Sequence, residues 1–138
     1  MNNYTFSKEE RLCSKRLIDS LFHNGSSFVI YPYRVVFLSI APEPTSRVPV
    51  QSIISVSKRK FRKAVDRNYI KRRVREAYRL QKSGLGRFLQ EHSLHLLVAF
   101  QYVGKDRNIP YQQLHRGMAG ALEKLMNETT KIYLGKDR

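Results

Sequence analysis

The sequence predicts a single α+β domain, an α-β sandwich in which a small sheet of three to four strands packs with three helices. Two observations predict this class. The 138 residues are 41% hydrophobic, with eight tyrosines and seven phenylalanines, which is enough for one core. Segments with helical and strand signals alternate in the order helix, strand, strand, optional strand, helix, strand, helix, and no internal repeat interrupts them.

Helix signals mark three segments. Ser7 and Glu10 have the spacing of a capping box, and the apolar stripe that follows them stops at Gly25. The middle segment contains no glycine or proline and ends before Ser83, and the last begins at Pro110, which suits a first helical turn. We expect the first helix somewhere within residues 8–24, the second over residues 62–82 and the third from Pro110 to about Asn127.

Strand composition marks three other segments. Residues 31–40 (YPYRVVFLSI) and 50–57 (VQSIISVS) are rich in β-branched or aromatic side chains, and the proline-rich residues 41–49 between them predict a loop. We therefore expect an antiparallel pair. Residues 93–102 contain the continuous apolar run LLVAF, which predicts a buried third strand. Residues 1–138 should form one domain with frayed ends at about 1–6 and 129–138.

The charge balance predicts a polyanionic partner. The chain has 26 Lys and Arg against 11 Asp and Glu, a formal net charge of +15. The segment from Lys58 to Arg79 holds eleven basic residues, and only Asp66 and Glu76 oppose them, so eleven minus two gives +9 in this segment alone.

The spacing within this segment separates two faces. At about 100° per residue, the cations at positions 67, 71, 75 and 79 fall on one ridge, with Asn68 and Arg72 beside it. Ile70, Val74 and Ala77 fall on a separate arc that can anchor the helix on a sheet. Like charges four residues apart weaken a helix, so an external polyanion is the best explanation for the ridge.

Other interpretations of the basic helix are a solvated surface, a nuclear-localisation signal or a membrane-surface helix. The apolar arc is too small to serve both a core and a bilayer. The single cysteine, Cys13, allows no disulfide within the chain, and the first residues have no basic stretch followed by an apolar one. We therefore expect a cytoplasmic protein with no membrane partner.

Candidate catalytic groups are weak. The sequence has no convincing acidic cluster for two-metal phosphodiester chemistry and no nucleophile constellation. His92 and His95 are three residues apart and could suggest a metal pair, but they lie in a strand or its approach without further ligands in support. We expect no catalytic residue and no metal site in this chain.

Residues 55–80, SVSKRKFRKAVDRNYIKRRVREAYRL, resemble the signature of the protein subunit of bacterial ribonuclease P. The family pattern runs from a strand ending in Ser/Thr-Val-Ser/Ala-Lys-Lys/Arg into a helix with Arg-Asn-Arg-x-Lys-Arg-x-x-Arg-Glu-x-Phe/Tyr-Arg. A weaker resemblance covers residues 10–127. The matching positions of the signature are Ser55, Val56, Ser57, Lys58, Arg59, Arg67, Asn68, Lys71, Arg72, Arg75, Glu76, Tyr78 and Arg79.

Three positions depart from the family pattern. Tyr69 stands where the family has the second arginine of Arg-Asn-Arg, and Ile18 replaces a usual phenylalanine. His95 stands where an aspartate is common. None of these changes removes the central cations.

The resemblance implies a fold of the ribonuclease P protein and ribosomal S5 domain 2-like type. It also implies an accessory subunit that binds a catalytic RNA, whose Mg²⁺ does the chemistry, and the 5′ leader of precursor tRNA, without an obligate protein partner. By the family pattern, the RNA-binding residues are Lys58, Arg59, Arg62, Lys63, Arg67, Asn68, Lys71, Arg72, Arg75 and Arg79. A cleft between the first helix and the sheet would hold the leader through Ile18, Phe22, Tyr33 and Phe37.

Two alternatives differ in what they predict. A ribosomal or ribosome-assembly protein would share the charge and the sandwich but would bind ribosomal RNA and support no cleavage. A protein-only nuclease would need carboxylates or a histidine pair in one cleft.

Overall fold

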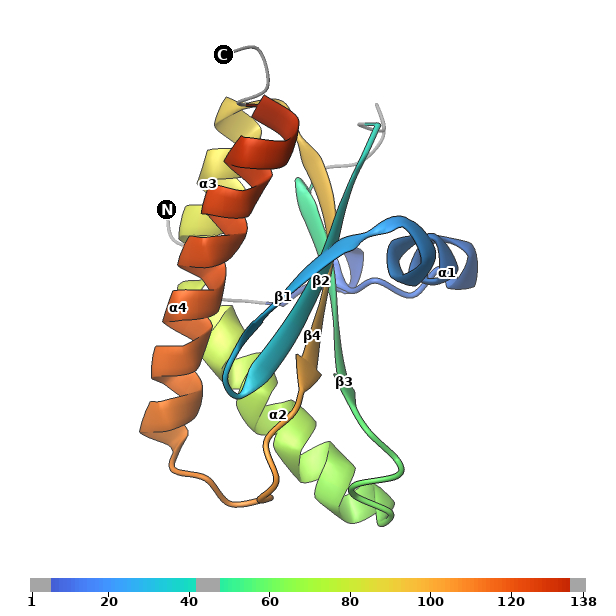
Figure 1. Cartoon of the computed structure of the whole chain (residues 1–138), viewed down its shortest axis with the longest axis vertical. Helices are drawn as coiled ribbons and strands as arrows, with labels where there is room; N and C mark the ends of the chain where they lie inside the picture. The colour runs from blue at the N-terminus through green and yellow to red at the C-terminus, as the bar shows by residue number, and fades with distance from the viewer. Residues whose placement is uncertain (1–5, 42–47, 135–138) are drawn as a thin grey trace.

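The computed structural model describes residues 6–41 and 48–134 and has a four-stranded mixed sheet (Figure 1). The strands are β1 (Ser26–Ile30), β2 (Tyr33–Ile40), β3 (Val50–Val56) and β4 (His95–Tyr102), in the spatial order β1-β2-β4-β3. β4 is antiparallel to β2 and parallel to β3. The α+β class is confirmed.

The expected antiparallel pairing of residues 31–40 with 50–57 is wrong, because β4 lies between β2 and β3. Seven of the eight β4 residues are buried, Gln101 being half-buried, and a strand covered on both faces belongs in the middle of a sheet. The optional extra strand exists as β1, which precedes β2 instead of following β3.

The described part of the chain contains four α-helices, one more than the three that were expected. They are α1 (Lys15–Asn24), α2 (Ala64–Gln81), α3 (Ser83–Glu91) and α4 (Tyr111–Thr129), with a 3₁₀ turn η1 (Lys8–Glu10) and a π-helical turn η2 (Thr130–Leu134). Ser83 does not end the helical region, because α3 begins there and buries Leu85 and Leu89.

The first expected helix lies within residues 8–24 as α1, and a separate 3₁₀ turn, η1, precedes it. The Ser7–Glu10 capping box closes only η1, where the Glu10 carboxylate accepts from the Ser7 backbone N–H at 3.1 Å. The chain then extends beside β3, since the Leu12 N–H donates to the Ser52 carbonyl at 2.8 Å. α1 has its own cap, the Ser14 hydroxyl oxygen, which accepts from the Leu17 N–H.

The predicted fraying of residues 129–138 is wrong for 129–134. Thr129 is buried, and the Tyr133 hydroxyl accepts from the Ser39 N–H at 3.3 Å, which ties η2 to β2. Residues 1–5, 135–138 and most of the expected 41–49 loop lie outside the described residues.

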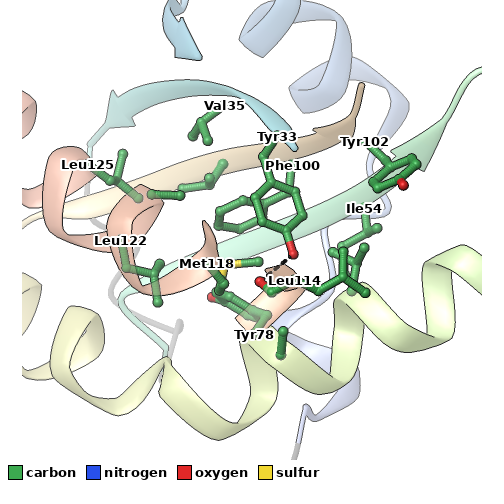
Figure 2. Packing of buried hydrophobic residues seen from close by; sticks show 14 of the residues in the cluster. Tyr33, Val35, Ile54, Tyr78, Phe100, Tyr102, Leu114, Met118, Leu122 and Leu125 are labelled. Atoms are coloured by element: carbon green, nitrogen blue, oxygen red, sulfur yellow. Dashed lines mark hydrogen bonds between the residues drawn. The ribbon is translucent and has the colours of Figure 1, made fainter. Parts of the chain in front are cut away.

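The sheet separates two layers of unequal size (Figure 1). α2, α3 and α4 cover one face and enclose the main core, where Tyr33, Phe100 and Tyr78 pack with Leu114 and Met118 (Figure 2). α1 lies on the other face, over a small cluster made by Leu12, Leu21, Val36, Leu97 and Ala99. Large parts of this second face are therefore left for other contacts.

Candidate nucleic-acid interface

α2 is fixed to the sheet by its apolar arc. Ile70, Val74, Ala77 and Tyr78 are buried in the main core. The Ser52 hydroxyl on β3 donates to the Tyr78 hydroxyl at 2.8 Å, and burial raises the pKa of this phenol. The remaining faces of α2 are thereby held in one orientation.

A basic ridge runs along the outer side of α2. We define it as Asn68, Lys71, Arg72 and Arg75, four of the predicted RNA-binding residues. Asn68 and Arg72 are exposed, and Lys71 and Arg75 are half-buried. Among the described residues, none of the three cations in this ridge makes a hydrogen bond or ion pair with the protein, so their charge is available to a ligand.

Two other predicted arginines have partners within the protein. Arg67 donates from Nη1 to the carbonyls of Phe61 and Arg62, both at 2.8 Å, and so braces the turn that precedes α2. Arg79 forms a two-point pair with Glu76, from Nε to Oε1 at 3.1 Å and from Nη2 to Oε2 at 2.7 Å. This hydrogen bonding lowers the pKa of Glu76. The helical wheel placed both arginines on the ridge but could not detect these partners.

The turn between β3 and α2 presents the other predicted cations. The Ser57 hydroxyl accepts from the backbone N–H groups of Arg59 and Lys60, at 3.1 and 3.3 Å, which shapes the turn. Exposed here are Lys58, Arg59, Arg62 and Lys63, together with Lys60, which the family pattern did not single out. The turn and the basic ridge form one continuous stretch of chain.

Tyr69 organises a contact that the sequence did not reveal. Its ring lies 4.3 Å from the guanidinium carbon of Arg107 and 5.3 Å from that of Arg73. Arg107 belongs to the loop between β4 and α4, nearly forty residues away in sequence. Spacing along one helix carries no signal for such a contact.

Two of the four predicted leader-binding residues are misplaced. Tyr33 and Phe37 face the main core and are fully buried, and the Tyr33 hydroxyl donates to the Leu114 carbonyl at 2.8 Å (Figure 2). Side chains alternate between the two faces of a strand, so β2 turns Arg34, Val36 and Leu38 toward α1 instead. The prediction was wrong because it chose aromatic residues without fixing which face of the sheet they occupy.

The other two residues lie on α1. Ile18 is half-buried against the small cluster, and Phe22 is 43% exposed at the end of the helix. α1 packs on β2 and β4 and covers Val36, Leu97 and Ala99. One half of this sheet face is therefore closed by α1.

The other half of the same face carries a polar row. Strand register aligns Val29 with Arg34, Arg34 with Gln101, and Gln101 with Ser55, so three polar residues and one valine form a row across all four strands. Val29 is 60% exposed, and the other three are half-buried. Arg34 donates from Nη1 to Gln101 Oε1 at 2.6 Å and from Nη2 to the Ser27 hydroxyl at 3.4 Å. This row ends two residues before the basic turn.

The histidine pair is divided by the structure. His95 is buried in β4, with a ring nitrogen 3.4 Å from Gln51 Oε1, whereas His92 is exposed and lies against Phe88. Across residues 6–41 and 48–134, no group of three or more His, Cys, Asp and Glu side chains could hold a metal ion. Nor does that part of the chain contain a helix with the length and apolar character needed to cross a membrane.

Comparison with known proteins places this architecture in a family. The sequence model of the ribonuclease P family matches residues 6–126. The chain belongs to the ribonuclease P protein family. The ribonuclease P protein components of Porphyromonas gingivalis strain W83 and Chlorobium phaeobacteroides are 40% and 34% identical to it, over 88% and 79% of this chain and 87% and 79% of theirs.

Solved ribonuclease P proteins share the fold. Those of Staphylococcus aureus and Thermotoga maritima superpose with a TM-score of 0.63 in both cases, at 21% identity. The matches cover 84% and 83% of this chain and 94% and 96% of theirs. This ribonuclease P protein is therefore a subunit of an endoribonuclease that associates with ribonuclease P RNA and assists in processing the 5′ leader of precursor tRNA.

Proposed function

We propose that this ribonuclease P protein binds the catalytic RNA through the basic turn and the basic ridge. The observation that carries the proposal is the set of unpaired cations on α2, held outward by a buried apolar arc. Each cation that neutralises a phosphate releases counterions, which strengthens binding and makes it depend on salt. Arg67 acts mainly by fixing the turn, because its Nη1 is engaged with two backbone carbonyls.

The 5′ leader of precursor tRNA lies, in this proposal, on the open half of the sheet face beside α1. Phe22 offers a stacking surface and Arg34 a charged group, and base stacking tolerates varied sequences. Tyr33 and Phe37 support this face from the core side and do not touch the leader. The polar row places Arg34 at its centre, between Val29 and Gln101.

The chemistry belongs to the RNA subunit. In this proposal, Mg²⁺ would be held by that RNA. The protein contributes binding and charge neutralisation in the cytoplasm, with ribonuclease P RNA as its one obligatory partner. The ribosomal and protein-only nuclease alternatives are both less consistent with the family assignment.

Reconstitution tests the assignment. Purified chain, a bacterial ribonuclease P RNA and precursor tRNA are combined at low Mg²⁺, and cleavage is measured with and without the chain. We expect stimulation by the wild-type chain and little by a variant in which Lys71, Arg72 and Arg75 are alanine. Absence of stimulation by the wild-type chain would overturn the proposal, and cleavage without RNA would overturn the assignment of chemistry to the RNA.

The leader surface has its own test. Phe22→Ala should weaken binding of precursor tRNA to the holoenzyme more than binding of mature tRNA, because only the precursor carries a leader. One stacked base is worth about 1–3 kcal/mol, so a loss of roughly tenfold is expected. Tyr31→Ala, which removes another exposed aromatic ring, is the matched control. Equal losses for the two tRNAs would exclude Phe22 from the leader surface.

A further inference from the structure

The loop between β4 and α4, residues 103–110, is fastened to α2. Arg73 on α2 donates from Nη2 to the Ile109 carbonyl at 2.7 Å and from Nη1 to the Arg107 carbonyl at 3.4 Å. The Tyr102 hydroxyl also donates to the Asp106 carbonyl. Backbone carbonyls held by an arginine and a tyrosine leave this loop little freedom, so its side chains are presented in fixed positions.

The side chain of Arg107, in this loop, is held by two contacts with α2. One face of its guanidinium lies over the Tyr69 ring at 4.3 Å, and its Nε lies 2.8 Å from Asp66 Oδ1. The contact with Asp66 is an ion pair without an aligned N–H bond. Stacking and ion pairing together fix both the plane of the group and its rotation in that plane.

The outer edge of this guanidinium remains available. Neither terminal nitrogen of Arg107 donates to another residue in the described part of the chain, and the side chain is 39% exposed. Two parallel terminal N–H groups match the oxygens of a phosphate. A fork that is already held in place loses little conformational freedom when a phosphate binds.

Charge neutralisation by Asp66 does not account for the whole environment of Arg107. Asp66 is the one acidic residue in the first turn of α2, and it neutralises Arg107 only from the Nε side. The nearby Arg73 directs its donors to backbone carbonyls, so it cannot serve as the ligand group itself. Of these two arginines, only Arg107 has both terminal nitrogens without an acceptor in the described part of the chain.

We propose that Arg107, stacked on Tyr69 and oriented by Asp66, is a phosphate-binding site that extends the RNA interface from α2 onto the loop between β4 and α4. The inference rests on the proposed function, because the phosphate belongs to the RNA that α2 contacts. The Arg107 site adds a contact from the loop between β4 and α4. The RNA is then positioned in the direction across the α2 axis as well as along that axis.

The test measures binding of the full chain to ribonuclease P RNA at several KCl concentrations. Arg107→Ala also leaves Asp66 without its partner, so Asp66→Asn/Arg107→Ala is compared with Asp66→Asn. We expect roughly tenfold weaker binding at low salt, as for one charged hydrogen-bonded contact, and a salt slope smaller in magnitude by about 1.

Three further variants separate geometry from charge. Arg107→Lys should keep the salt slope but weaken binding, because an ammonium lacks the fork. Tyr69→Phe should bind like the wild type, whereas Tyr69→Ala should lose part of the affinity. Arg87→Ala removes an exposed arginine on α3, at the other end of the helical layer in Figure 1, and should leave the slope unchanged.

The outcomes distinguish this inference from the proposed function. If the wild-type chain binds the RNA and the Lys71, Arg72 and Arg75 variant does not, the proposed function stands. If Asp66→Asn/Arg107→Ala then matches Asp66→Asn in affinity and slope, the Arg107 site is overturned. If the wild-type chain itself fails to bind the RNA, the proposed function is overturned, and the Arg107 site that rests on it is overturned as well.

Discussion

At the scale of single residues, a positive charge does not define a role. Arg67 and Arg75 belong to the same series of cations spaced four residues apart on α2, two steps from each other. In the structure, Arg67 is bonded to two carbonyls of its own chain, and Arg75 has no partner in the described residues. The first therefore stabilises the protein and the second is free to bind.

This difference predicts distinct effects for two alanine variants. Arg75→Ala should leave the free energy of unfolding within about 0.5 kcal/mol of wild type and reduce the magnitude of the salt slope of RNA binding by about 1. Arg67→Ala should lower the free energy of unfolding by about 1–3 kcal/mol, because charged hydrogen bonds are lost. Urea denaturation and filter binding measure the two quantities. An unchanged slope for Arg75→Ala would remove it from the interface.

Tyr33 predicts the opposite pattern. Tyr33→Phe removes a buried hydroxyl that donates to Leu114, so the free energy of unfolding should fall by about 1 kcal/mol. Affinity for RNA and for precursor tRNA should not change, because the residue lies in the main core. Selective loss of precursor tRNA binding in a folded Tyr33→Phe variant would return Tyr33 to the leader surface.

At the scale of elements, the N-terminal turn is joined to the helical layer through a buried ion pair. Lys82 Nζ, at the junction of α2 and α3, lies 2.6 Å from Glu10 Oε1, and both side chains are at least 91% buried. Glu10 also accepts from Ser7, so one carboxylate caps η1 and holds the junction. Removing one partner of a buried pair leaves an uncompensated charge.

Lys82→Met should therefore lower the free energy of unfolding by about 3–5 kcal/mol. Glu10→Gln/Lys82→Met, which removes both charges, should recover a substantial part of that loss. Chemical denaturation of the three proteins measures the difference. A double variant no more stable than Lys82→Met would show that the two groups do not act as a pair.

The elements that sequence could predict are those with a strong local signal. α2 and β4 follow from an uninterrupted helical segment and a continuous apolar run. The sequence did not predict the extended segment at Arg11 between η1 and α1, because its conformation is set by pairing with Ser52 on β3. The placement of Tyr33 and Phe37 also failed, since composition identifies a strand but not the face that each side chain occupies.

The same limit applies to the candidate site. The free cations at positions 71, 72 and 75 lie on one helix, where spacing determines their relation. Arg73, Arg107 and the polar row through Arg34 depend on which strands and loops become neighbours. Such contacts between distant segments leave no periodic trace in one sequence.

At the scale of the whole molecule, the sandwich keeps three phenols away from water. Burial raises the pKa of Tyr33 and Tyr78 above the ordinary value, and it raises that of Tyr102 to about 12. In the unfolded chain these groups ionise near pH 10. The folded state then binds more protons than the unfolded state, so stability is complete below pH 10 and decreases as pH rises from 10 toward 12.

We therefore expect the free energy of unfolding to fall over this pH range. Tyr102→Phe should reduce the dependence, because one of the three protected phenols is gone. Tyr69→Phe removes a phenol that is only half-buried and serves as the control. Denaturant unfolding at pH 9, 10 and 11 measures the effect, and an identical pH dependence for Tyr102→Phe and the wild type would contradict it.

The central position of β4 also sets an order of events during synthesis. β2 and β3 cannot be joined until residues 95–102 enter between them, and α2 belongs to the connection from β3 to β4. Pairings between segments so distant in sequence form late, because closing a long loop has an entropic cost. A nascent chain that ends before β4 would carry most of the positive charge of the proposed RNA surface without its shape.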